Sequence, residues 1–178
     1  MTNRIVTPSR SLWCVALAAL IVSAALADEH SAAIEESYKK VVDATFAREY
    51  ETMADYTYPG LLELMGGREQ MVQLVRDTMD QLDARGIAIT KRELLSVSAV
   101  VKGGDELFAV LTTTAELSTP EGMIRQKAAS IAISGDDGNT WTYVDVGRLE
   151  SDRLLQIVPN LPPALVIPPG VEPEFIPN

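Results

Sequence analysis

Apolar residues recur every three or four positions over residues 31–53, and charged residues fill most of the positions between them. This spacing predicts a long amphipathic helix that can break near Arg48. Pro59 ends it, because the residue before a proline avoids the helical conformation. The same periodicity predicts a second helix over residues 68–85, with Gly86 placed to cap its C-terminus. The two apolar stripes are formed by Ile34, Tyr38, Val41, Val42, Phe46, Tyr50 and Met53, and by Met71, Val72, Leu74, Val75, Met79 and Leu82.

The hydrophobic period changes to two after Gly86. Four β-rich stretches follow, separated by short runs of turn-forming residues. Connections this short join antiparallel neighbours, so they predict a meander, and strands this long have to curve. The third stretch lacks alternation between Ala128 and Ile133, which is typical of a central strand covered on both faces. The four stretches are residues 87–101, 107–117, 123–134 and 140–149.

A short helix over residues 152–158 and a proline-rich tail close the chain. Most of the prolines fall between Pro159 and Pro177, so residues 159–178 are predicted to be extended and without sheet partners. We expect the apolar residues of this tail to lie along the domain and its last few residues to be free. Helices followed by a meander predict an α+β domain, in which two to three N-terminal helices pack on one side of a strongly curved antiparallel sheet of four or more strands.

Three short motifs give this order of elements a family resemblance. They are Ala54-Asp55-Tyr56-Thr57-Tyr58-Pro59, Gly66-Gly67-Arg68-Glu69 and Trp141-Thr142-Tyr143-Val144-Asp145. With them, residues 34–158 resemble the nuclear transport factor 2-like superfamily, the cystatin-like α+β cone shared with SnoaL-like polyketide cyclases and ketosteroid isomerase. The resemblance implies a cone-like domain over residues 28–158 with a ligand site in its hollow interior, and it implies that two cones can pair as a homodimer. Because the superfamily includes enzymes and non-enzymes, the fold alone does not give the function.

Residues 1–27 have the pattern of a bacterial signal peptide. Arg4 and Arg10 form a basic start, an apolar run follows over residues 12–26, and Ala25-Leu26-Ala27 supplies a cleavage site. The run is short for a bilayer-spanning helix, which needs roughly 20 residues. We therefore expect cleavage after Ala27 and a periplasmic or extracellular protein, rather than one held by an uncleaved anchor.

Composition excludes several classes of function. The only cysteine, Cys14, lies in the expected signal peptide, which excludes a disulfide-stapled scaffold and thiolate chemistry. The net charge is −10, and the loss of two arginines with the signal peptide makes the remaining chain more acidic. Such a surface repels phosphate backbones and anionic lipid, so we expect no nucleic-acid partner and no membrane contact after cleavage.

The side chains that usually carry chemistry are scarce. The single histidine, His30, lies near the expected mature terminus and is interpreted as a solvated side chain rather than a base or a metal ligand. Residues 134–141 match the Asp-box pattern Ser-x-Asp-x-Gly-x-Thr-Trp, but one copy predicts a structural turn, not a propeller, and the spacing is not that of an EF-hand. The methionines at 53, 65, 71 and 79 are interpreted as core filler, and the cations Lys91, Arg92, Arg125 and Lys127 as solvated edge positions. We expect no metal ion and no cofactor.

The resemblance implies that acids and tyrosines in the cone interior form the site. The candidate ligand-binding residues are Tyr56, Tyr58, Tyr143 and Asp145, and the weaker catalytic candidates are Asp55, Tyr58 and Asp145. Asp145 could act as a carboxylate base while Tyr58 holds a developing enolate.

Three functions follow from this set. The first is a non-catalytic domain that binds a small apolar molecule or a protein partner in its cavity. The second is an isomerase, cyclase or dehydratase that works without histidine, which requires Asp145 or Asp55 in a closed pocket within reach of a tyrosine. The third is an interaction module whose tail docks on a partner.

Overall fold

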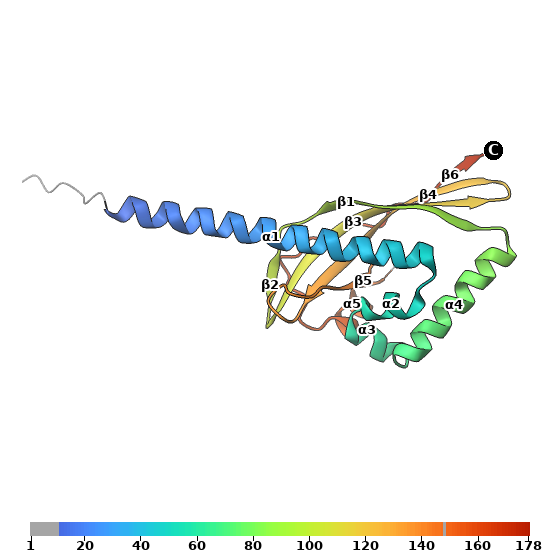
Figure 1. Ribbon diagram of the computed structural model, residues 1–178, viewed down its shortest axis with the longest axis horizontal. Coiled ribbons are helices and arrows are strands. Elements are labelled where there is room, and N and C mark those ends of the chain that lie inside the picture. The colour runs from blue at the N-terminus through green and yellow to red at the C-terminus, as the bar shows by residue number, and fades with distance from the viewer. Residues whose placement is uncertain (1–10, 148) are drawn as a thin grey trace, which may run out of the picture.

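The computed structural model describes residues 11–147 and 149–178, with side chains from residue 29 onward. The expected signal peptide, residues 1–27, lies outside the residues whose side chains are described. The described chain is an α+β domain with five helices and an open six-stranded antiparallel sheet (Figure 1). The helices are α1 (Ser11–Ala47), α2 (Tyr50–Asp55), α3 (Pro59–Leu64), α4 (Arg68–Ala84) and α5 (Ser151–Ile157). The strands are β1 (Ala88–Val97), β2 (Val101–Gly103), β3 (Glu106–Thr119), β4 (Gly122–Ser134), β5 (Thr142–Asp145) and β6 (Glu174–Pro177).

The helix boundaries follow local backbone chemistry. Arg48 has a left-handed φ of 58°, which ends α1 and confirms the predicted break. Its guanidinium then donates to Asp83 near the end of α4, at 2.8 Å. Gly86, with φ +69°, ends α4 as predicted. Pro59 was predicted to end a helix. It is also the first residue of α3, a position where a missing N–H costs nothing.

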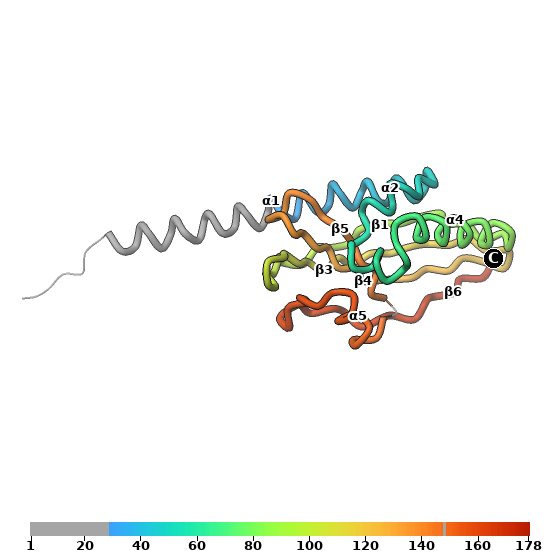
Figure 2. The backbone as a smooth tube through the Cα atoms, turned by 90° about the horizontal axis from the view of Figure 1, so that it is seen from below, coloured from blue at the N-terminus to red at the C-terminus, as the bar shows by residue number. Residues whose placement is uncertain are grey.

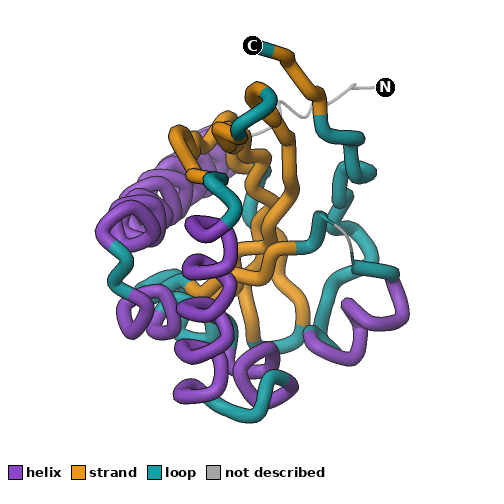
Figure 3. Tube along the Cα trace, turned by 90° about the vertical axis from the view of Figure 1, so that its right-hand side faces the viewer, coloured by secondary structure: helices purple, strands orange, loops and turns teal. Residues whose placement is uncertain are grey.

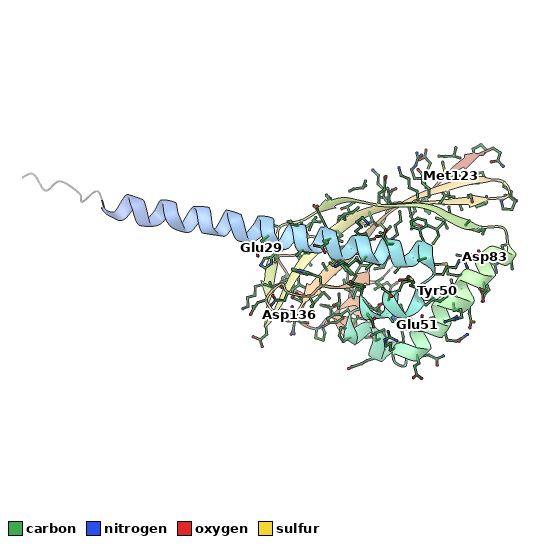
Figure 4. The ribbon with its side chains drawn as sticks, viewed as in Figure 1. Glu29, Tyr50, Glu51, Asp83, Met123 and Asp136 are labelled. Carbon is green, nitrogen blue, oxygen red and sulfur yellow. The ribbon has the colours of Figure 1, made fainter. Side chains whose placement is uncertain are left out.

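The β3–β4 hairpin is the centre of the sheet. Its register runs from Leu107 opposite Ser134 to Thr119 opposite Gly122, and Figure 4 shows Met123 and Asp136 at its opposite ends. The strand predicted over residues 87–101 is divided into β1 and β2, which both pair with β3. It divides at Ser98, whose backbone N–H donates to the carbonyl of Val110 while its hydroxyl accepts the N–H of Val110.

The end of the tail corrects one expectation. Residues 174–177 are not free but form β6, which pairs with residues 122–125 of β4. This edge is open because β5 pairs only with residues 130–133 of the same strand. Gly122 permits the close approach, since a Cβ there would collide with the carbonyl oxygen of Ile176.

Two core clusters lie on opposite faces of the sheet. On one face, Ile34 and Tyr38 of α1 pack against β3, β4 and β5. On the other face, Leu154 and Ile157 of α5 and Leu165 of the tail pack against the same strands. Figures 2 and 3 show this order of α1, sheet and α5. The prediction that residues 128–133 are covered on both faces is confirmed. The expectation that helices cover only one side is wrong, because α5 and the tail shield apolar side chains on the second face.

A third cluster joins α4 to α2 instead of laying α4 flat on the sheet. Tyr50, Ala54, Met71 and Val72 are its buried members. Met53, Met65 and Met79 pack beside them, so these methionines fill the core as predicted. None of the described helices has the length and hydropathy needed to cross a bilayer.

Candidate functional site

An inner cavity of about 340 Å³ lies between the helices and the sheet face that α1 covers. It exists because α4 is held by α2 and α3 at the side of the sheet. Its apolar wall comes from all four of the helices that precede the sheet, and includes Val41, Met53, Leu61, Met65, Met71 and Val75. The sheet contributes Arg92, Ser130, Tyr143 and Asp145. A cavity of this size, mostly apolar with a few polar groups, is typical of small-molecule sites.

Tyr143 fixes one wall of the inner cavity. Its hydroxyl donates to the carbonyl oxygen of Ile34 at 3.1 Å and lies 2.5 Å from the hydroxyl of Ser37. The ring of Tyr38 meets its ring edge-on, with centroids 5.3 Å apart. Burial raises the pKa of Tyr143 well above its usual range, against the opposing effect of the Ser37 hydrogen bond. The Tyr143 hydroxyl is therefore a neutral structural donor, not a proton carrier near neutral pH.

Arg92 lies against Tyr38 at the edge of the inner cavity. Its Nε donates to the Tyr38 hydroxyl at 3.0 Å, and its guanidinium carbon is 5.6 Å from the centroid of that ring. Arg92 lies on the edge strand β1, as expected, but it is half-buried rather than freely solvated. Sequence reasoning missed it because Tyr38 lies 54 residues away along the chain.

A second space, the outer pocket, adjoins the inner cavity. It has a volume of about 420 Å³ and lies on the same face, over the distal halves of β3 and β4. Arg92 and Asp145 line both spaces, so they mark the junction between them. Ile89, Ala115, Leu117, Ala128 and Leu149 make the outer pocket largely apolar.

Three of the five candidate residues from the sequence line the inner cavity. Tyr56, Tyr143 and Asp145 do so together, with the backbone N–H of Tyr143 donating to the Tyr56 carbonyl at 2.8 Å. Asp145 is solvent-exposed, and its Oδ1 accepts the N–H of Gly147 at 3.1 Å.

Asp55 and Tyr58 lie outside this group. The Asp55 side chain is 61% exposed and is bound by Arg68, with Nη2 and Oδ1 2.6 Å apart. Tyr58 packs against the core on the other face, beside α5, and donates to Glu106 Oε1 at 3.2 Å. Burial and the neighbouring Glu106 carboxylate raise the pKa of Tyr58 to about 12. The proposed pairing of Asp145 with Tyr58 as base and enolate holder is therefore wrong.

The Asp-box sequence forms a turn, as predicted. Asp136 accepts the backbone N–H of Thr140 at 2.9 Å and the Ser134 hydroxyl at 2.8 Å. These hydrogen bonds, with that of the Thr140 hydroxyl, lower the pKa of Asp136. The sequence predicted a solvated His30. The side chain is instead half-buried against Trp141, with ring centroids 6.0 Å apart. No group of three or more potential metal-ligating His, Cys, Asp or Glu side chains occurs in the described part of the chain.

Tyr143 predicts a loss of stability at alkaline pH. Its pKa is raised in the folded protein, whereas the unfolded chain should titrate near 10.0. Below that pH both states keep the proton, and the contribution to stability is fully present. Above it the unfolded chain loses its proton first, so the free energy of unfolding falls as pH rises, by at most about 1.4 kcal/mol per pH unit. In urea unfolding above about pH 10, Tyr143→Phe should show a shallower decline of the free energy of unfolding with pH.

Tyr58→Phe serves as a comparison for this measurement. The pKa of Tyr58 is also raised, so Tyr58→Phe should remove only the part of the pH dependence that comes from Tyr58 and keep the part from Tyr143. Equal slopes for Tyr143→Phe and the parent protein would contradict the assignment of a buried neutral hydroxyl.

The geometry of the site is the basis for inferring its function. No protein-family model, curated protein or solved structure matches this chain.

Proposed function

We propose that this chain is an exported, non-catalytic domain that binds a small apolar molecule in the inner cavity. The observation that carries the proposal is the cavity itself, about 340 Å³ with a wall of aliphatic and methionine side chains from four helices. Methionine is unbranched and polarizable, so such a wall can adapt to apolar ligands of different shape. The exported location is part of the proposal and rests on residues 1–27.

The same geometry supports a cone-like fold of the nuclear transport factor 2-like type. α1 lies across one face of the sheet, and α2, α3 and α4 continue around the cavity. The motif residues Tyr56 and Tyr143 line this space, as the resemblance implies. We therefore propose the cone interior as the ligand site.

An isomerase, cyclase or dehydratase is less well supported. It requires a carboxylate in a closed pocket within hydrogen-bonding reach of a tyrosine, since burial is what raises a carboxyl pKa into a useful range. Asp55 and Asp145 are both solvent-exposed, and neither accepts a hydrogen bond from a tyrosine among the described side chains. Docking of the tail on a partner is also not favoured, because β6 already pairs with β4 of the same chain.

Native mass spectrometry of the protein purified from its own source tests both parts of the proposal. The expected mass is that of a chain beginning at Asp28 plus a bound small molecule. Denaturation should remove the added mass, because the ligand is held without a covalent bond. A soluble protein that begins at Met1 or Thr2 would contradict export, and a chain without added mass that also binds no apolar probe would contradict the binding function.

A matched pair of variants locates the ligand. Val75→Trp places a large side chain in the inner cavity and should remove the added mass. Leu74, the preceding residue on α4, is exposed to solvent, so Leu74→Trp should retain the added mass. Loss of the added mass in both variants, or in neither, would show that the ligand is not in the inner cavity.

A further inference from the structure

The junction between the inner cavity and the outer pocket holds polar groups that no described contact uses. We infer that the ligand is amphipathic, with an apolar body in the inner cavity and a carboxylate head bound by Arg92 and Ser130. This inference rests on the proposed function and adds the chemical class of the ligand.

Arg92 is a preformed binding group for a carboxylate. Its Nε is held by Tyr38 at 3.0 Å, which fixes the plane of the guanidinium. Its two Nη atoms have no hydrogen bond or ion pair among the described side chains, although the residue lines both spaces. The contrast is with Arg48, Arg68, Arg76 and Arg125, each of which binds a carboxylate of this chain. A planar fork with two free donors matches a carboxylate in a bidentate arrangement.

Ser130 supplies a second donor in the same space. It is only 2% exposed and lines the inner cavity, yet its hydroxyl makes no hydrogen bond within the described residues. Every fully buried side-chain polar atom of the described chain has a hydrogen-bond partner. Because the Ser130 hydroxyl has none, its oxygen must be accessible from the cavity. A hydroxyl that faces a cavity and has no protein partner is available to hydrogen-bond a ligand there.

Asp145 sets the limits of the assignment. It is the register partner of Ser130 across β4 and β5, and it lines both spaces. As a carboxylate it would repel an anionic head and attract a cationic one. Asp145 is exposed, however, and one of its oxygens is already bonded to Gly147, so water can satisfy it without a ligand. The guanidinium of Arg92 is half-buried and less well hydrated, so a bound counter-ion stabilises it more than it stabilises Asp145. This favours an anionic head over a cationic one.

Three probes of equal chain length separate the ligand classes. Decanoate, decan-1-ol and decylamine share one apolar body and differ in the charge of the head. Isothermal titration of the purified protein at neutral pH should show the tightest binding for decanoate. Arg92→Gln should weaken decanoate by roughly 10- to 100-fold, the range expected for a charge-assisted pair, and leave decan-1-ol within about twofold. Arg92→Lys should recover only part of the loss, because an ammonium cannot form the fork.

Further variants control for folding and for general charge. Lys127→Gln removes a cation from an exposed position of β4 that lines neither space, and should leave decanoate binding unchanged. Ser130→Ala should weaken decanoate several-fold with an unchanged circular dichroism spectrum. Asp145→Asn should strengthen it, because a repelling charge is lost.

The outcomes distinguish this inference from the proposed function. Equal binding of decanoate and decan-1-ol, unaffected by Arg92→Gln, would overturn the carboxylate head while the apolar cavity stands. Preferred binding of decylamine that Asp145→Asn abolishes would overturn it in favour of a cation. No binding of any probe would overturn the carboxylate inference, and the absence of added mass in the native protein as well would overturn the proposed function.

Discussion

Replacing Phe108 with alanine should lower the free energy of unfolding by about 3–5 kcal/mol, the range for removing a buried aromatic side chain. Phe108 lies on β3, is 0% exposed and belongs to the cluster under α5. Gly103 gives it room, since a Cβ there would lie 2.9 Å from its ring. Urea unfolding followed by circular dichroism measures the change. An unaltered slope of the free energy of unfolding against urea concentration would show that the substitution destabilises the folded state.

Phe175 provides the control for Phe108. It is an aromatic residue on the same sheet, but it lies on β6 and is exposed. Phe175→Ala should cost well under about 1 kcal/mol, as surface substitutions usually do. A similarly small cost for Phe108→Ala would mean that α5 and the tail do not seal the second face of the sheet.

Replacing Trp141 with alanine should also cost about 3–5 kcal/mol. The side chain is 3% exposed, and its Nε1 donates to the carbonyl oxygen of Gly138 at 3.1 Å. The substitution therefore removes both core packing under α1 and a hydrogen bond that closes the Asp-box turn. Thermal unfolding followed by circular dichroism is the suitable measurement.

Trp141→Phe separates the two contributions of this side chain. It keeps most of the apolar ring and loses the N–H, so it should recover a large part of the stability. Equal midpoints for Trp141→Ala and the parent protein would contradict a role for this turn in holding α1 on the sheet.

Local patterns predicted most of the elements. The period of α4 and its glycine cap needed no tertiary information, and neither did the turns that separate the main strands. The run at residues 128–133 also indicated two covered faces before either layer was known. The partner of the tail could not be predicted, because Glu174 pairs with Arg125, far away in sequence, and its prolines indicate an extended segment.

The candidate site was predictable only where one strand positions it. Tyr143 and Asp145 are two residues apart on β5, so they share a face, and both line the inner cavity. Tyr58 was misplaced because Pro59 starts α3 and Tyr58 packs beside α5 on the opposite face. Arg92 and Tyr38 meet only through the packing of α1 on the sheet, which no local pattern encodes.

The composition of β6 has a consequence for self-association. An outermost strand offers unpaired backbone groups to any other chain, and long apolar edges promote aggregation. β6 has four residues, is flanked by Pro173, ends at Pro177 and carries the charged Glu174. Proline has no N–H to offer a further strand, and a buried charge would be costly between two sheets. The prolines, which in the sequence indicate a segment without sheet partners, thus allow it to cover the edge of β4 without creating a new edge that could pair with another chain.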